Sequence, residues 1–306
     1  MEKAYISGQK TFFLPEENNL EEMSDMKKKL QFGKKTLFTD NAAFIMGIVN
    51  CTPDSFYSGS RGNFQECVSR AFQLIEEGAD ILDLGGESTR PGSSYVSEKE
   101  EIERIIPVLN EIRKKSDIAV SIDTRKSAVM KAAFDFGADL LNDVSALEDD
   151  PGMADLIAEN EAGVILMHKK GTPVDMQNNI SYTNLFDEVE DYLEKRAAYA
   201  ESKGISSEKI ILDPGIGFSK NLEQNKILTA KAGTLCGKKY PVLMALSRKS
   251  YLGEITGRPA EERLEETVTA DLIAVMKGAD IVRVHDVLPC RESLMVLKSF
   301  IDSGLI

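Results

Sequence analysis

The sequence predicts an α/β fold, a (β/α)8 TIM barrel with an N-terminal extension. From residue 44 onward, short apolar runs suited to buried parallel strands alternate with amphipathic stretches long enough for helices. There are about eight such runs, the number of strands in a closed parallel barrel. Three of the helical stretches end in the same tripeptide, Gly-Ala-Asp, directly before an apolar run. This repetition is typical of successive βα units.

The apolar runs predict the strands. Each is short and rich in aliphatic residues, as strands buried on both faces of a parallel sheet are. They lie at residues 44–49, 81–84, 119–122, 140–141, 164–167, 210–212, 242–246 and 281–284.

The stretches between the runs predict the helices. The clearest has apolar residues at helical spacing from 102 to 112, behind a capping box formed by Ser97 and Glu100. Pro107 lies inside this helix and is expected to kink it. The glycines of the three Gly-Ala-Asp tripeptides, at 78–80, 137–139 and 278–280, are expected to end their helices in the left-handed conformation.

The predicted units span roughly 260 residues, close to the length of a (β/α)8 barrel. An open, doubly wound sheet uses the same units and stays the alternative. We favour the barrel because no Gly-x-Gly-x-x-Gly turn follows the first run. Residues 1–40 do not show this alternation of apolar runs and helical stretches, and they are predicted to be an extension packed on the barrel. A helix is predicted to start at residues 19–22 of this extension, and residues 41–306 are predicted to form the barrel.

Composition excludes several classes of function. The formal net charge of -13 opposes nucleic-acid phosphates, so nucleic acid is not an expected partner. No apolar run is long enough for a membrane span and no signal peptide is visible, so no membrane partner is expected. The four cysteines show no metal-ligand spacing, which indicates thiols in a reducing compartment and hence a cytoplasmic location.

Polar side chains that a core does not need follow almost every apolar run. In a barrel these positions meet at the C-terminal mouth, where active sites of this fold lie. The mouth is therefore predicted to be polar and functional. In strand order the residues are Asn50 and Asp54; Glu87, Ser88, Thr89 and Arg90; Asp123 and Arg125; Asn142 and Asp143; His168; Asp213; Ser247, Arg248, Lys249 and Ser250; and Arg283, His285 and Asp286.

Two groups of these residues suggest ligands. Asp123, Asn142 and Asp213 place single carboxylates and an amide at strand ends, which suits the amide and amino edge of a flat heterocycle. Asp213 could accept two parallel bonds from a guanidine-like edge. The second group is cationic and lies largely after the last two strands, the usual phosphate site of this barrel class. It comprises Arg90, Arg248, Lys249, Arg283 and His285.

The alternative for the cationic group is ion pairing with the many acidic residues of the chain. We favour anion binding because Arg283 and His285 lie at the end of one strand and can bind a phosphate oxygen from two directions. The only two histidines, His168 and His285, lack a clustered third ligand for zinc. Asn50 with phosphate oxygens suits Mg²⁺ instead.

Six motifs, in order, resemble those of the dihydropteroate synthase family. They are Met46-Gly-Ile-Val-Asn-Cys-Thr-Pro-Asp-Ser-Phe56, Asp83-Leu-Gly-Gly-Glu-Ser-Thr-Arg-Pro-Gly92, Ser121-Ile-Asp-Thr-Arg-Lys126, Leu212-Asp-Pro-Gly-Ile-Gly-Phe218, Ser247-Arg-Lys-Ser250 and Arg283-Val-His-Asp-Val287. The resemblance implies a pterin-binding (β/α)8 barrel, a homodimer, that joins 4-aminobenzoate to 6-hydroxymethyl-7,8-dihydropterin diphosphate in folate biosynthesis. It departs from the family at residues 57–61 of the first loop.

The resemblance also implies roles for single residues. Pterin binding falls to Asp123, Asn142, Asp213 and Lys249. Diphosphate binding falls to Asn50, Arg90, Arg283 and His285, with Mg²⁺ on Asn50. The aminobenzoate site falls to Thr89, Pro91, Phe218 and Ser250. The implied catalytic residues are Asp123, Lys249, Arg283 and His285.

The hypothesis is a displacement in which Mg²⁺ and the cations stabilise the leaving pyrophosphate, while Asp123 offsets positive charge on the pterin methylene. Two alternatives remain. A methyltetrahydrofolate-dependent methyltransferase would share the Asp and Asn contacts without needing the cations for a diphosphate. A non-catalytic pterin-binding protein would keep Asp213 and Asn142 and would tolerate losses in the first two loops.

Overall fold

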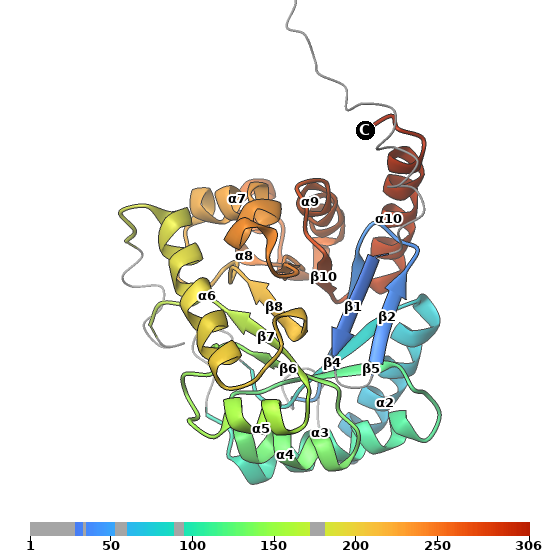
Figure 1. Cartoon of the computed structure of the whole chain (residues 1–306). Helices are drawn as coiled ribbons and strands as arrows, with labels where there is room; N and C mark the ends of the chain where they lie inside the picture. The colour runs from blue at the N-terminus through green and yellow to red at the C-terminus, as the bar shows by residue number, and fades with distance from the viewer. Residues whose placement is uncertain (1–27, 33–34, 53–59, 89–94, 172–180) are drawn as a thin grey trace, which may run out of the picture.

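All eight predicted runs form strands of one parallel sheet in the computed structural model (Figure 1), which describes residues 28–32, 35–52, 60–88, 95–171 and 181–306. The last strand but one is shorter than the predicted 242–246, because only two of its residues pair regularly. The strands are β3 (Phe44–Asn50), β4 (Ile81–Gly85), β5 (Ala119–Asp123), β6 (Leu140–Asp143), β7 (Gly163–Met167), β8 (Ile210–Asp213), β9 (Leu243–Met244) and β10 (Ile281–Val284).

The sheet closes on itself. Its strands pair in the order β8-β7-β6-β5-β4-β3-β10-β9. The two end strands meet through a parallel bridge between Leu212 and Val242, and the Leu212 N–H donates to the Pro241 carbonyl at 2.9 Å. This closure confirms the barrel and rejects the open, doubly wound sheet.

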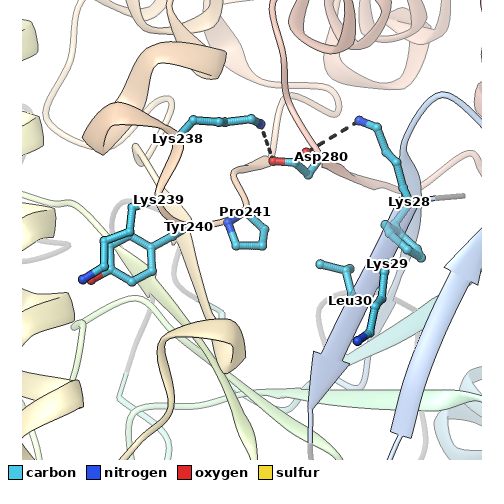
Figure 2. A pocket seen from close by; sticks show the side chains of 9 residues that line it. Lys28, Lys29, Leu30, Lys238, Lys239, Tyr240, Pro241 and Asp280 are labelled. Carbon is cyan, nitrogen blue, oxygen red and sulfur yellow. Dashed lines mark hydrogen bonds and ion pairs between the residues drawn. The ribbon is translucent and has the colours of Figure 1, made fainter. Parts of the chain in front are cut away.

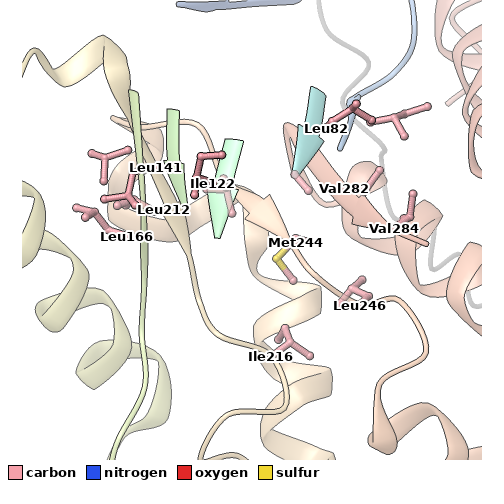
Figure 3. Packing of buried hydrophobic residues seen from close by; sticks show 14 of the residues in the cluster. Leu82, Ile122, Leu141, Leu166, Leu212, Ile216, Met244, Leu246, Val282 and Val284 are labelled. Carbon is pink, nitrogen blue, oxygen red and sulfur yellow. The ribbon is translucent and has the colours of Figure 1, made fainter. Parts of the chain in front are cut away.

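Alternation along each strand separates an outer apolar layer from a barrel interior. Leu82, Ile122 and Leu212 belong to the large core between strands and helices, part of which Figure 3 shows. The residues beside them in sequence, such as Ile81 and Ile211, belong to a second buried cluster inside the barrel. Toward the C-terminal ends the inward positions become polar, so the interior has an apolar base and a polar mouth.

A β-hairpin covers the base of the barrel. It consists of β1 (Lys28–Phe32) and β2 (Lys35–Thr39), which pair antiparallel. Leu30 and Phe32 are 3% and 1% exposed and pack in the interior cluster with the first residues of the barrel strands. The part of the predicted extension that the structure describes therefore closes the apolar end of the barrel. The helix predicted at 19–22 lies outside the described residues.

Helices surround the sheet (Figure 1). The helix predicted near 102–112 is continuous through Pro107, and the Ser97 hydroxyl accepts the Glu100 N–H as predicted, at 3.3 Å. No helix in the described segments has both the length and the apolarity to cross a membrane. The helices are α2 (Ser60–Glu77), α3 (Glu98–Arg113), α4 (Ser127–Asp135), α5 (Met153–Glu159), α6 (Leu185–Ser202), α7 (Leu222–Ala230), α8 (Ser250–Thr256), α9 (Leu264–Met276) and α10 (Val287–Asp302), with 3-10 turns η3 (Ser207–Lys209), η4 (Ala232–Lys238) and η5 (Ala260–Glu262).

The three Gly-Ala-Asp tripeptides have the same two structural roles. Each glycine has a positive φ, between 86° and 96°, which ends the helix as predicted. Each aspartate then bonds to the neighbouring strand, which the sequence analysis did not anticipate. Asp80, Asp139 and Asp280 accept the backbone N–H groups of Ile45, Val120 and Val242 at 2.8, 2.9 and 2.9 Å. These carboxylates fix where each new strand starts against its neighbour.

Candidate active site

Strand register brings the predicted strand-end residues to one level at the mouth. Asn50 lies opposite Gly85, Gly85 opposite Asp123, and Asp123 opposite Asn142. Positions in register share one side of a sheet, so these side chains face the interior together. Gly85 carries no side chain and leaves the layer open between Asn50 and Asp123.

Asp83, one step below this layer, connects the two sides of the mouth. It is fully buried, and its Oδ2 accepts Arg283 Nε at 2.6 Å and Asn142 Nδ2 at 3.0 Å. The same guanidinium donates through Nη2 to Asp123 at 2.8 Å. Four side chains from β4, β5, β6 and β10 therefore form one hydrogen-bonded network, which holds Asn142 and Asp123 in fixed orientations.

This network perturbs its ionisable groups. Burial raises the pKa of Asp123 to about 7; Arg283 opposes this, while Asp83, Glu101 and Asp143 reinforce it. Burial also works against the charge on Arg283, but the carboxylates of Asp83 and Asp123 outweigh it and raise the guanidinium pKa. An aspartate that titrates near neutral pH inside a mouth is a recognised mark of a functional site.

Asp213 is oriented by the loop that follows β8. Its Oδ1 accepts the Gly215 N–H at 2.7 Å. Gly215 has φ +70°, and a Cβ there would lie 1.9 Å from the His168 carbonyl oxygen, so only glycine allows this approach. Burial raises the pKa of Asp213, and Lys249, Lys220 and Arg283 counteract it. Asp213 thus shares the electrostatic environment of the network without bonding to it directly.

Lys220 holds that loop from inside. It is 3% exposed and donates to the carbonyls of Gly215 and Phe218 at 2.9 and 2.8 Å. It also lies 3.0 Å from His168 Nδ1. Burial lowers the pKa of Lys220 to about 7, and burial, with Lys220 and Lys170 nearby, lowers that of His168 to about 2. His168 is therefore neutral, and its Nδ1 can accept a hydrogen bond from the Lys220 ammonium group.

The segments after β9 and β10 complete the mouth. Lys249 precedes α8, and its Nζ lies 4.5 Å from the centre of the Phe218 ring, a cation–π contact. Ser250 is the first residue of α8 and is exposed. His285 follows β10, and its Nδ1 lies 2.9 Å from Ser247 Oγ. Lys249 and Phe218 thus lie together, and the charge of Lys249 counteracts the rise in the pKa of Asp213.

Several residues predicted at the mouth serve the fold. Arg248 pairs with Asp286 at 2.9 Å, so its charge is balanced by a carboxylate, as the ion-pair alternative predicted. Arg125 pairs with Asp149 at 3.0 Å. Asp143 accepts bonds from Ser145 and from the Leu147 N–H, which hold the turn after β6. The predicted Asp54, Thr89, Arg90 and Pro91, and the variant positions at 57–59 of the first loop, lie outside the described residues.

Two residues of the mouth were missed by the sequence analysis. Asp83 is a charged residue inside an apolar strand, and reading that strand with period two would have pointed it inward. Lys220 lies in a loop and is brought to His168 only by the fold. Within the described segments, no cluster of three or more His, Cys, Asp or Glu side chains could hold a metal ion.

Comparison with known proteins agrees with this geometry. The family model described as pterin binding enzyme matches residues 46–285. The chain is 40% identical to the dihydropteroate synthase of Escherichia coli (strain K12) over 260 residues, 85% of this chain and 92% of that protein. The solved Xanthomonas albilineans dihydropteroate synthase with 4-aminobenzoic acid has a TM-score of 0.83 at 40% identity, covering 90% of this chain and 98% of that one.

A second solved structure, the Xanthomonas albilineans enzyme in complex with 7,8-dihydropteroate, has a TM-score of 0.78 at 36% identity, covering 89% of this chain and 97% of that one. The family match spans most of the barrel, including the mouth residues from Asn50 to His285. The chain therefore belongs to the pterin-binding enzyme family and, within it, to the dihydropteroate synthases.

Proposed function

We propose that the chain joins 4-aminobenzoate to 6-hydroxymethyl-7,8-dihydropterin diphosphate, giving 7,8-dihydropteroate and pyrophosphate. The names of its relatives support this reaction, as do the 4-aminobenzoic acid and 7,8-dihydropteroate in the solved structures. The observation that carries it is the common location of Asp123, Asn142, Asp213, Lys249 and Arg283 at one mouth.

The pterin would lie across the polar layer. Asn142 and Asp123 offer an amide and a carboxylate on one side, and Asp213 offers a carboxylate on the other. A flat heterocycle with several N–H groups matches these acceptors. Lys249, already against the Phe218 ring, would bind a ring acceptor, and Phe218 and Ser250 would border the aminobenzoate.

The reaction forms a C–N bond and breaks a C–O bond. The amine nitrogen of 4-aminobenzoate attacks the pterin methylene carbon, the diphosphate oxygen departs with the bonding electrons, and the amine loses a proton. Ionised Asp123 would offset positive charge on the methylene. Among the described residues, Asp83 and Asp123 bind only Nε and Nη2 of Arg283, so its Nη1 donors, with His285, would receive the leaving anion.

Asn50 fits a magnesium role. Its amide oxygen is a hard ligand at the end of β3, and Mg²⁺ in proteins takes few side-chain ligands together with substrate phosphates and water. When bound there, Mg²⁺ supplies positive charge to the diphosphate oxygens. Asn50 would hold it next to the open position of Gly85.

We propose a homodimer formed through α9 and α10. These helices pack together and expose large apolar side chains, namely Ile273, Met276, Met295, Val296 and Phe300. Such a patch on a globular surface marks an interface. Analytical sedimentation of the double variant Ile273→Glu/Val296→Glu should show a monomer; an unchanged dimer would reject this interface.

We propose a cytoplasmic location because all four cysteines are buried and none forms a disulfide.

The reaction is tested by measuring pyrophosphate released from the dihydropterin diphosphate, with and without 4-aminobenzoate and Mg²⁺. We expect release that depends on both. No release would indicate a non-catalytic binding protein, and methyl transfer from methyltetrahydrofolate in place of release would indicate the methyltransferase alternative.

A further inference from the structure

A pocket of about 260 Å³ lies at the base of the barrel, at the opposite end from the mouth. One wall is the start of β1, and the other is the segment that leads from η4 into β9 (Figure 2). Leu30, Phe44, Tyr240 and Pro241 give it an apolar lining. Four lysines also line it, in a chain whose net charge is -13: Lys28, Lys29, Lys238 and Lys239.

Two of these lysines converge on one carboxylate. Lys238 Nζ lies 2.5 Å from Asp280 Oδ2, and Lys28 Nζ lies 3.6 Å from Asp280 Oδ1 (Figure 2). Asp280 is shared further, because Oδ2 also accepts the Val242 N–H at 2.9 Å. One negative charge therefore faces two positive charges, and the carboxylate is already engaged in fixing β9.

Of the two lysines that face Asp280, Lys28 makes the weaker polar contacts. Its other contact is a long bond of 3.4 Å to the Ala279 carbonyl. Burial lowers the pKa of Lys28, and Lys238 lowers it further, against the opposing effect of Asp280. Lys239 is balanced by Glu201 at 2.9 Å, whereas Lys29 is exposed and adds positive charge at the rim. The pocket thus has an excess of positive charge that a bound anion would neutralise.

The backbone beside the pocket is held in an unusual conformation. Cys236, Gly237 and Lys238 have φ values of 49°, 59° and 63°, three consecutive residues in the left-handed region. This conformation is unfavourable for the two residues with side chains. Lys238 is anchored there by its bonds to the Gly278 carbonyl and Asp280. Strain that delivers a charged side chain to a cavity is typical of binding sites.

We propose that this pocket binds a phosphate monoester with a small flat or apolar body. The phosphoryl group would contact Lys28 and Lys238 from the pocket side, next to the Asp280 carboxylate that joins them, and the body would rest on Leu30, Tyr240 and Pro241. A phosphate monoester is a dianion at pH 7 and matches two ammonium groups better than a single carboxylate does. The pocket volume of about 260 Å³ lies just below the lower end of the range for ligand pockets, roughly 300 Å³, which favours a small body over a nucleotide.

Binding there would connect β1 to the segment before β9 and stabilise the hairpin on the barrel. The proposal is independent of the reaction at the mouth. Phenyl phosphate is a suitable probe, measured by calorimetric titration and by thermal unfolding of the full chain. We compare the wild-type protein, Lys28→Met/Lys238→Met and the control Lys99→Met, whose side chain is 87% exposed on α3.

We expect phenyl phosphate to raise the Tm of the wild-type and control proteins, and the double variant to bind at least about tenfold more weakly. Lys28→Arg/Lys238→Arg should bind nearly as well as wild type, which separates lost charge from lost folding. Equal affinity for all variants would place binding elsewhere, including the mouth, and would overturn the proposal, as would no binding to the wild type. Inorganic phosphate binding as tightly as phenyl phosphate would overturn the role of the apolar lining.

Discussion

Replacing Asp83 by Asn tests whether the buried network orients the mouth. The carboxylate is 0% exposed and serves both Arg283 and Asn142. Asn preserves the shape of the side chain but removes its charge, so Asp123 is then the only carboxylate among the described residues that forms an ion pair with Arg283. If the network positions Asn142 and Asp123, both stability and turnover should fall.

The size of the effect follows from the burial of the pair. Removing one partner of a buried ion pair costs about 3–5 kcal/mol of unfolding free energy. We expect about 3 kcal/mol for Asp83→Asn, the lower end of that range, because Asp123 remains 2.8 Å from Arg283. A displacement of about 1 Å in a positioning group can cost about 100-fold in rate, and we expect a loss of that order in kcat/KM for the pterin substrate.

Urea unfolding and steady-state kinetics measure the two effects. Asp155→Asn is the matched control, since Asp155 pairs with Lys203 on the surface, with side chains 55% and 33% exposed. We expect no measurable change in stability or turnover for this control. Wild-type kinetics and a wild-type urea midpoint for Asp83→Asn would refute the argument that Asp83 organises the mouth.

Three further predictions concern pH and packing. If ionised Asp123, with its pKa of about 7, is the active form, kcat/KM should fall as pH drops below about 7; a flat wild-type profile from pH 6 to 8 would contradict this. Phe32 lies under the barrel, and Phe32→Ala should lower the free energy of unfolding by about 3–5 kcal/mol. The control Phe38→Ala replaces a side chain of the same hairpin that is 59% exposed, and it should lower this free energy by less than about 0.5 kcal/mol. Equal losses in urea unfolding would show that the hairpin does not close the base of the barrel. Asp271 is buried, neither oxygen has a hydrogen-bond partner among the described residues, and burial raises its pKa well above 3.8. Because the folded state then holds the proton more tightly than the unfolded state, stability should fall as pH rises above about 4. Asp271→Asn should remove about 1 kcal/mol per pH unit of that slope, and an unchanged slope would exclude Asp271 as its source.

The strands, the glycine helix ends and the strand-end polar residues could all be predicted from sequence, because each depends on local pattern. An apolar run reports burial, and a glycine after a helix reports a positive φ, as at Gly78. Since parallel strands share one direction, the residues that end them share one mouth. The pattern therefore predicts that Asp123 and Asn142 lie together, and their strand register agrees.

Contacts made between distant segments were not predictable in this way. Asp280 follows the glycine that ends α9, but its bond to Val242 depends on which strand lies beside β10. Arg283 was predicted to face an anion, and its bonds to Asp83 and Asp123 depend on barrel closure across 200 and 160 residues of sequence. Strand β9 is shorter than its apolar run because pairing depends on the neighbouring strands.

The most direct test of the account is a crystal structure of the chain with 7,8-dihydropteroate. We predict that the pterin ring contacts Asn142, Asp213 and Lys249 at the C-terminal mouth, with Asp123 beside the methylene carbon and the aminobenzoate group next to Phe218. A pterin bound at the base of the barrel, or at the mouth without contact to Asn142 and Asp213, would contradict it.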